Sequence, residues 1–217
     1  SMKNIYVSSV KLFIFVVFLG LGQTVFAQLS GIKTIPGDYA SIAAFVTDVN
    51  LVGVGTGGVT ANVAAGYTEN TSSPILLTAT GTATNPIVFQ KSGAGVNPII
   101  TRTDAGTLTT SSLGAQGDAV LMISGSDFVT INGIDIQATT SAIEYGIMTD
   151  KPNGSDGCKN ITIQNCVITM TKGTSGFVIG VHISNGPLTT ASATGQTIAS
   201  VAGANENITI IGNTIQN

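Results

Sequence analysis

The sequence predicts an all-β fold, a right-handed parallel β-helix with a short capping helix at its N-terminal end. Three segments repeat one pattern, a short alternating apolar run, a break and a second short run: FVTINGIDIQ from Phe128, NITIQNCVIT from Asn160 and NITIIGNTIQ from Asn207. Alternation with a period of two indicates strands, and the break indicates a sharp corner. Such recurrence predicts stacked coils, whereas the alternative fold, a sandwich of antiparallel hairpins, would show no stacking of equivalent positions.

Each repeat follows a further strand candidate, so each coil is expected to contain three strands. These candidates, AVLMIS, YGIMTD and IGVHIS, begin at Ala119, Tyr145 and Ile179. Alignment of the repeats places apolar residues at nearly every inward position: Val129, Ile131, Ile134 and Ile136, then Ile161, Ile163, Cys166 and Ile168, then Ile208, Ile210, Asn213 and Ile215. The corner positions are glycine or asparagine, which tolerate the left-handed backbone that a tight corner needs: Gly133, Asn165 and Gly212.

Residues 1–27 carry the pattern of a cleavable signal peptide. Lys3 and Lys11 precede an apolar run from Leu12 to Gly22, and this run is shorter than the about 20 residues of a membrane-spanning helix. Small or apolar residues occupy the positions that signal peptidase reads, so cleavage is expected between Ala27 and Gln28. The mature chain is therefore expected to be extracellular or at the cell surface.

Residues 28–58 are predicted to form an N-terminal segment that contains the capping helix. Apolar side chains recur with the spacing of one helical face: Ile42, Phe45, Val46 and Val49. Asp38 or Ser41 can cap the start of this helix, and Gly53 can end it. A solenoid exposes the apolar interior and the unpaired strand edges of its first coil, so a helix across that end is physically expected.

Residues 59–217 are predicted to wind the coils. The first coils should use the strands VTANV (59–63), PILLT, PIVFQ and PIIT. Pro74, Pro86 and Pro98 stand at strand starts, where a missing N–H costs least.

Composition argues against a nucleic-acid-binding protein. Charged residues make up 9% of the 217 residues, against about 25% in a typical chain. The net charge is −3, and the eight Lys and Arg residues are scattered singly, so no basic stripe can hold a phosphate backbone. The surface is expected to be rich in hydroxyl and amide groups and weakly charged.

The two cysteines are not expected to form a disulfide. If the segment between Cys158 and Cys166 is extended at about 3.3 Å per residue, their Cα atoms lie far beyond the roughly 7 Å that a bridge allows. Cys166 aligns with the inward Ile134 and is expected to be a small buried apolar side chain. Cys158 is expected to be a loop thiol with no assigned role.

No catalytic constellation is visible. Proton abstraction or hydrolysis on a sugar chain needs two or three acidic groups that converge on one outward surface, yet the stacked neighbours of Asp135 are a valine and a threonine. Arg102, the single arginine, is expected to form a solvated surface pair with Asp104. His182, the single histidine, is expected on an exposed strand, with a ligand role as the alternative.

One segment is compatible with Ca²⁺. Asp150, Asn153 and Asp156 in DKPNGSDG supply oxygen ligands around a glycine, although their spacing matches neither an EF-hand nor a nonapeptide calcium repeat. The other interpretation is an Asx- and Gly-rich turn. No other cofactor is expected.

Two outward features could contact ligands. One is a column of threonines, compatible with ordered water or ice: Thr130, Thr162 and Thr209. A single column is not the flat multi-row array that ice needs, and stacked threonine also favours strands. Tyr67 and Tyr145 could stack on sugar rings through the apolar faces of their own rings, with packing at coil edges as the alternative. Tyr145 and the outward His182 are together a candidate ligand face.

Three stretches carry a resemblance to a known group of proteins: KTIPGDYASIAAFVTDVN, GGVTANVAAGYTEN and TATGTATNPIVFQ. Over residues 33–217 the chain resembles the start of right-handed β-helix regions in large exported proteins of Bacteroidetes, often substrates of the type IX secretion system. It is also loosely similar to pectin-lyase-like β-helices. The resemblance implies the fold and the export route; the C-terminal sorting domain of type IX substrates is not seen in the sequence.

We therefore expect a non-catalytic stalk, adhesin or polysaccharide-contacting module of a cell-surface protein. The alternative is the N-terminal part of a polysaccharide lyase or glycoside hydrolase whose catalytic coils lie downstream. The last coil ends at Asn217 without a visible cap, so the chain is expected to be a fragment that self-associates or frays at this edge. Its expected partners are extracellular polysaccharide, a cell-surface protein or further coils of the same protein.

Overall fold

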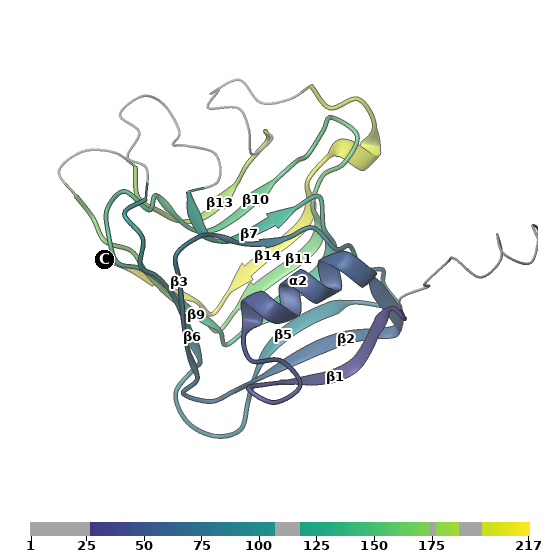
Figure 1. Cartoon of the computed structure of the whole chain (residues 1–217). Helices are drawn as coiled ribbons and strands as arrows, with labels where there is room; N and C mark the ends of the chain where they lie inside the picture. The colour runs from purple at the N-terminus through teal and green to yellow at the C-terminus, as the bar shows by residue number, and fades with distance from the viewer. Residues whose placement is uncertain (1–26, 107–117, 174–176, 187–196) are drawn as a thin grey trace, which may run out of the picture.

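The computed structural model shows three all-parallel β-sheets wound into a right-handed solenoid (Figure 1). It describes residues 27–106, 118–173, 177–186 and 197–217, so most of the predicted signal peptide lies outside the described residues. From β2 onward, successive strands step from one sheet to the next, and each coil contributes one strand to each sheet. The predicted fold class, an all-β parallel β-helix with one short helix, is confirmed.

We name the three sheets A, B and C. Sheet A consists of β1 (Leu29–Ile35), β2 (Val54–Ala64), β5 (Ile87–Ser92), β8 (Asp127–Asn132), β11 (Lys159–Gln164) and β14 (Glu206–Ile211). Sheet B consists of β3 (Thr68–Thr71), β6 (Ile99–Arg102), β9 (Asp135–Ala138), β12 (Val167–Thr169) and β15 (Thr214–Gln216). Sheet C consists of β4 (Ile75–Leu77), β7 (Ala119–Ser124), β10 (Tyr145–Asp150) and β13 (Ile179–Ile183). A 3-10 turn (Val201–Gly203) precedes β14.

The strand register agrees with the repeat found in the sequence. In sheet A, Ile161 pairs with Val129 on one side and with Ile208 on the other. In sheet B, Ile168 lies between Ile136 and Ile215. Equivalent inward residues therefore stack coil on coil, and each fully buried Val or Ile side chain contributes about 1.5–3 kcal/mol through burial.

The corners between sheets A and B adopt the left-handed conformation that the sequence predicts. The backbone φ angle is 67° at Gly133, 57° at Asn165 and 65° at Gly212. A second left-handed column, which the sequence analysis did not anticipate, lies at the first residue of each repeat: Phe128 (53°), Asn160 (56°) and Asn207 (54°). Asparagine tolerates this conformation better than most residues, whereas Phe128 adopts it at a steric cost.

The helix α2 (Ile42–Val52) covers the N-terminal end of the solenoid, as predicted (Figure 1). Ser41 is its N-cap, because the Ser41 hydroxyl accepts a hydrogen bond of 3.0 Å from the Ala44 N–H. Gly53, with φ at 76°, ends the helix. The predicted apolar face is the buried one: Ile42, Phe45, Val46 and Val49.

Two polar side chains attach α2 to the first coil. The Glu69 carboxylate on β3 accepts hydrogen bonds from the Ile42 and Ala43 N–H groups, at 2.6 and 2.9 Å. The Asn50 side chain donates to the Leu76 carbonyl at 2.7 Å, and its oxygen accepts from the Thr78 N–H, just beyond β4, at 2.8 Å. The helix thereby covers the apolar interior and also satisfies backbone groups that no strand pairs at this end.

The structure adds two strands to those predicted. β1 precedes the helix and extends sheet A beyond β2, and β3 carries Glu69. β2 also begins before residue 59, at Val54. Pro74, Pro86 and Pro98 each stand immediately before a strand, as predicted.

We predict that backbone amide exchange is slow at Ile131 and Ile163 and markedly faster from Ile208 onward. β8 and β11 are paired on both edges, whereas β14 is paired with β11 alone among the described strands. Ile210 is 45% exposed, while Ile131 and Ile163 are completely buried. Hydrogen exchange in a dilute monomer measures this gradient, and uniform protection through β14 would contradict it.

Candidate functional site

The outward face of sheet A carries two side-chain columns that run across the coils. The first is a threonine column interrupted by one valine: Thr60, Val88, Thr130, Thr162 and Thr209. The second consists of amides until its last member: Asn62, Gln90, Asn132, Gln164 and Ile211. Neighbouring strands are about 4.7–4.9 Å apart, so each column repeats hydroxyl or amide groups at that interval.

Hydrogen bonds between side chains order the amide column. The Gln90 side chain donates to the Asn62 carbonyl oxygen at 2.8 Å. Asn132 accepts from Asn165 of the next coil at 2.9 Å. Because each amide has both donor and acceptor groups, these bonds leave further groups to face solvent or a ligand.

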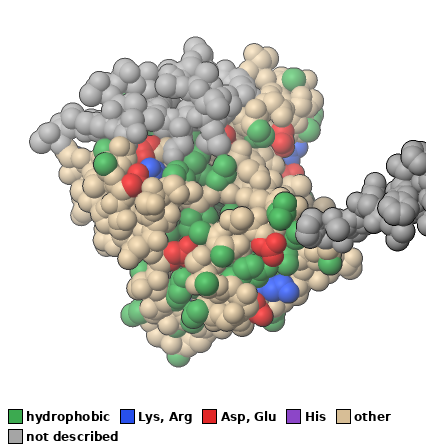
Figure 2. Space-filling view, viewed as in Figure 1, with side chains coloured by type: hydrophobic (Ala, Val, Ile, Leu, Met, Phe, Trp, Pro, Cys, Tyr) green, Lys and Arg blue, Asp and Glu red, His purple; other side chains and the backbone are tan. Residues whose placement is uncertain are grey.

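Sheet B has one comparable column, formed by Asn70, Thr101, Gln137, Thr169 and Gln216. Thr101 donates to Gln137 at 3.3 Å, and Gln216 donates to Thr169 at 3.2 Å. Sheet A therefore presents the broader polar face, with two adjacent columns across its strands. Figure 2 shows that the charged side chains are few and scattered on the visible side of the molecule.

The sequence anticipated only part of this face. The register of Thr130, Thr162 and Thr209 is confirmed. The amide column was missed, although Asn132 and Gln164 lie two residues after Thr130 and Thr162 in the repeat. The alternation of the repeats could have found Asn132 and Gln164 as outward residues. The alignment of β2 and β5 with the repeats, which adds Asn62 and Gln90 to the column, required the structure.

Asp135 has a structural role in the corner region. One of its carboxylate oxygens accepts hydrogen bonds of 2.8 Å from the Asn97 side chain and from the Val167 N–H of the next coil. Its strand neighbour on β6 is Ile99. No acidic side chain is stacked with it at these positions, in agreement with the sequence prediction.

The predicted surface pair of Arg102 and Asp104 is instead part of a buried ion-pair cluster. The Arg102 side chain is 7% exposed and donates to both carboxylate oxygens of Asp104, at 2.6 and 2.8 Å. It also lies 2.8 Å from the carboxylate of Asp118, which is 3% exposed, and donates to the Ala119 carbonyl. The prediction of a solvated pair was wrong for Arg102, because the coil places its guanidinium against the start of β7, whereas the Asp104 side chain stays partly exposed.

Tyr145 and His182 are brought together, as the candidate ligand face required, but the tyrosine is not exposed. Their rings stack with centroids 5.0 Å apart and planes inclined by 29°. Tyr145 is completely buried, and this burial, with Glu144 nearby, raises its pKa to about 12. Burial also lowers the pKa of the half-buried His182. Tyr145 packs with Met122 and Met148 and offers no open ring face to a sugar. Its predicted alternative role, packing, is the one observed.

Tyr67 also packs at a coil edge. It is half-buried, and its hydroxyl donates to the Ala40 carbonyl at 2.9 Å just before the capping helix. Desolvation and the nearby Glu69 raise the pKa of this hydroxyl.

The three oxygen-bearing residues of the candidate calcium segment have different environments. Asp150 is completely buried at the end of β10, whereas Asn153 is exposed and its side-chain oxygen Oδ1 accepts from the Ser155 N–H at 2.8 Å. This bond and the short bridge between Asn153 and Asp156 are those of an Asx turn. In the described part of the chain, no group of three or more His, Cys, Asp or Glu side chains could hold a metal ion.

Both cysteines are free and buried, in agreement with the prediction of no disulfide. Cys166 faces the interior, as predicted. Cys158 lies in the loop just before β11, as predicted, but it is completely buried, and its sulfur lies 3.3 Å from the Asp150 carbonyl and 3.4 Å from the Ile123 carbonyl. Burial raises the pKa of this thiol to about 12, so it is a poor nucleophile.

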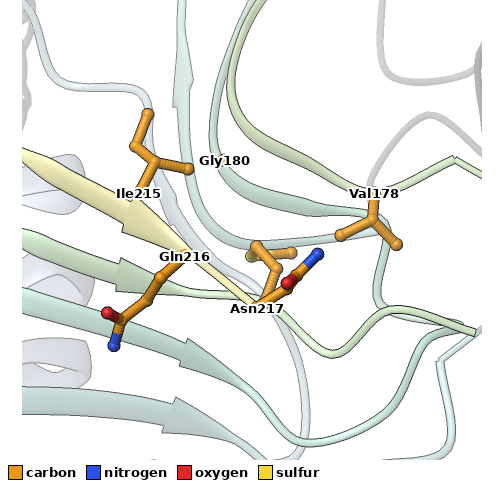
Figure 3. Close-up of a pocket in the computed structure, with 6 residues that line it drawn as sticks. Val178, Gly180, Ile215, Gln216 and Asn217 are labelled. Carbon is orange, nitrogen blue, oxygen red and sulfur yellow. The ribbon is translucent and has the colours of Figure 1, made fainter.

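Two pockets lie near the ends of the solenoid. One, of about 190 Å³, is at the last coil and is lined by Met170, Val178, Gly180, Ile215, Gln216 and Asn217 (Figure 3). The other, of about 280 Å³, lies between α2 and the first coil and includes Val46, Thr47, Ser73 and Leu76. Neither wall carries an acidic, basic or imidazole side chain, so neither offers a general acid or base.

Comparison with known proteins found no matching protein family, no matching curated protein and no matching solved structure. Within the described residues, no helix is long and apolar enough to cross a membrane. The fold is therefore established from the coil geometry, and the function has to be argued from the surfaces described above.

Replacing Arg102 by Met is expected to lower the free energy of unfolding by about 3–5 kcal/mol, because it removes the guanidinium that neutralises the buried Asp118. Hydrogen bonds from Arg102 lower the pKa of Asp104 below 3.8, so this part of the stability is present above that pH and is lost as the pH falls through the lowered pKa.

Denaturant unfolding measures both effects. Lys172→Met, on an exposed residue, is the control and should change stability by less than about 0.5 kcal/mol. Equal effects of the two substitutions would contradict a buried ion-pair cluster.

Calcium removal is expected to leave the melting temperature nearly unchanged. An ion stabilises a fold only through its affinity for the native state, and the Asn153 side chain is already used in an Asx turn. Thermal unfolding with and without EDTA tests this. A drop of several degrees that Ca²⁺ reverses would identify the Asp150 to Asp156 segment as a metal site.

Proposed function

We propose that this chain is a non-catalytic, rigid module of an exported or cell-surface protein and that it contacts uncharged extracellular polysaccharide through the outward face of sheet A. The observation that carries the proposal is the pair of adjacent threonine and amide columns, held in register across the coils. The face is built from strands, so its groups are fixed relative to one another.

The chemistry of the two columns suits a neutral sugar chain. Threonine hydroxyls and side-chain amides both donate and accept hydrogen bonds, as sugar hydroxyls do. Each contact is individually modest, at about 0.5–1.5 kcal/mol net, but a repeated row allows several contacts with one polymer. The two columns contain no charged side chain, which favours a neutral polymer over an anionic one.

The same groups support a binding role over a catalytic one. Threonine and amide side chains do not titrate near neutral pH and cannot serve as a general acid or base pair. The buried cluster around Arg102 is engaged in internal contacts, at 2.6 and 2.8 Å from its carboxylate partners. A stalk or adhesin uses rigidity and repetition, and both are properties of a stacked solenoid.

The proposal includes export. The apolar stretch before Ala27 and the small residues at the expected cleavage site support a signal peptide. The sequence resemblance to β-helix regions of Bacteroidetes proteins, and to type IX secretion substrates among them, supports the same route.

The test is co-sedimentation with insoluble cellulose and chitin, using the whole chain. Thr162→Glu lies in the middle of the sheet A columns and should weaken binding about tenfold, equivalent to 1.4 kcal/mol. The reason is that the glutamate sets an unpaired charge on the protein against a neutral polymer. Thr169→Glu is the matched control on sheet B, since both threonines are partly exposed strand residues. It should bind like the unmodified chain.

Failure of the unmodified chain to bind either polymer, or an equal loss in both variants, would contradict sheet A as the contact face. Incubation with pectin, alginate and chondroitin, monitored by the absorbance of unsaturated products, tests the lyase alternative. Turnover there would overturn the non-catalytic assignment.

A further inference from the structure

Lys151 is a buried cation next to a side-chain amide. It follows β10, has no exposed surface, and its Nζ atom donates to the Asn185 Oδ1 atom at 2.6 Å. The ion pairs found within the described residues both belong to Arg102, and neither involves this lysine. A buried ammonium group without a carboxylate partner is costly, so the arrangement calls for a chemical explanation.

Backbone hydrogen bonds on both sides hold the two residues in register. The Ser184 N–H donates to the Thr149 carbonyl at 3.0 Å, and the Lys151 N–H donates to the Gly186 carbonyl at 3.1 Å. These bonds continue the parallel pairing of β10 with β13, in which Thr149 pairs with Ile183. Asn185 therefore stands opposite Lys151 on the next coil and is fixed by the backbone.

We propose that Lys151 and Asn185 condense to form an intramolecular isopeptide bond between consecutive coils. The Lys151 ammonium group gives one proton to the Asn185 amide nitrogen, and the lone pair that this frees on Nζ attacks the Asn185 Cγ atom, so that a C–N bond forms. The bond from Cγ to the Asn185 amide nitrogen breaks, and that nitrogen takes a second proton from Nζ and leaves as ammonium, which is ammonia plus the proton of the former Lys151 cation. The reaction is a transamidation without redox change, so it needs no oxidant, reductant or cofactor.

The geometry favours this reaction. The Nζ atom donates at 2.6 Å to the oxygen that is covalently attached to the carbon under attack, so the two reacting groups are already in contact. Groups fixed in this way react with effective molarities of up to about 10⁵–10⁸ M. Asn185 is exposed, which gives the released ammonia a path to solvent. The product also removes the buried charge, because an amide replaces the amine.

The cross-link would close a covalent loop that contains β11, β12 and β13. A bond across a loop restricts the unfolded chain, as a disulfide does, and limits the separation of one coil from the next. It would do so without cysteines, both of which are free here. Resistance to unwinding suits a module exposed outside the cell, although the chemistry stands independently of any ligand.

Intact-mass spectrometry of the denatured, purified whole chain is the test. The unmodified chain should be lighter than its sequence mass by one ammonia molecule. Lys151→Arg and Asn185→Ala should each have their full sequence mass, because each lacks one reacting group. Lys159→Arg is the matched control, since Lys159 donates to the Val201 carbonyl rather than to a side-chain amide, and it should keep the ammonia deficit.

Proteolysis must locate the bond. A branched peptide that joins Lys151 to Asn185 is the expected product. A full sequence mass in the unmodified chain would overturn the proposal. So would an ammonia loss without branching, as in a succinimide at Asn185 and Gly186 or a cyclised Gln28. These outcomes do not depend on whether the variants fold.

Discussion

The in-register stacking of parallel strands is the constraint on which the rest of the structure depends. Each coil must return to the same position above the last, and this is achieved at corners where the backbone turns left-handed. Gly133, Asn165 and Gly212 do this between sheets A and B, and Phe128, Asn160 and Asn207 do it where each repeat begins. Polar side chains then bond across coils near the corners, as when Asp127 accepts from the Lys159 N–H at 2.8 Å.

The same register determines the chemistry of the surface. A strand that stacks an isoleucine under an isoleucine must also stack its outward neighbours, because side chains alternate between the two faces. The threonine and amide columns of sheet A are therefore the external counterpart of the interior isoleucine columns. A face of this kind repeats one pattern of hydroxyl and amide groups, and this repetition supports the proposed contact with a polymer.

Buried polar groups in this solenoid are used to join segments that are distant in sequence. Glu69 and Asn50 join the helix to the first coil, and Arg102 joins sheet B to the start of β7. Lys151 and Asn185 join two consecutive coils at the end of sheet C. Each contact lies where the regular strand pairing ends, so polar side chains supplement the backbone ladder at these positions.

The sequence by itself determined the coil fold, the inward columns, the glycine and asparagine corners, the helix with Ser41 and Gly53 at its ends, and the threonine column, because these depend on local periodicity and turn chemistry. It did not reveal β1, β3 or the exact alignment of β2 and β5, since no repeat marks them. It did not reveal the left-handed Phe128 either, since a phenylalanine rarely adopts that conformation. Tertiary structure alone decided that Arg102, Tyr145 and Cys158 are buried and that Lys151 meets Asn185. Burial and long-range contact depend on which segments the coils bring together, and the loops between repeats vary too much in length for spacing to predict that.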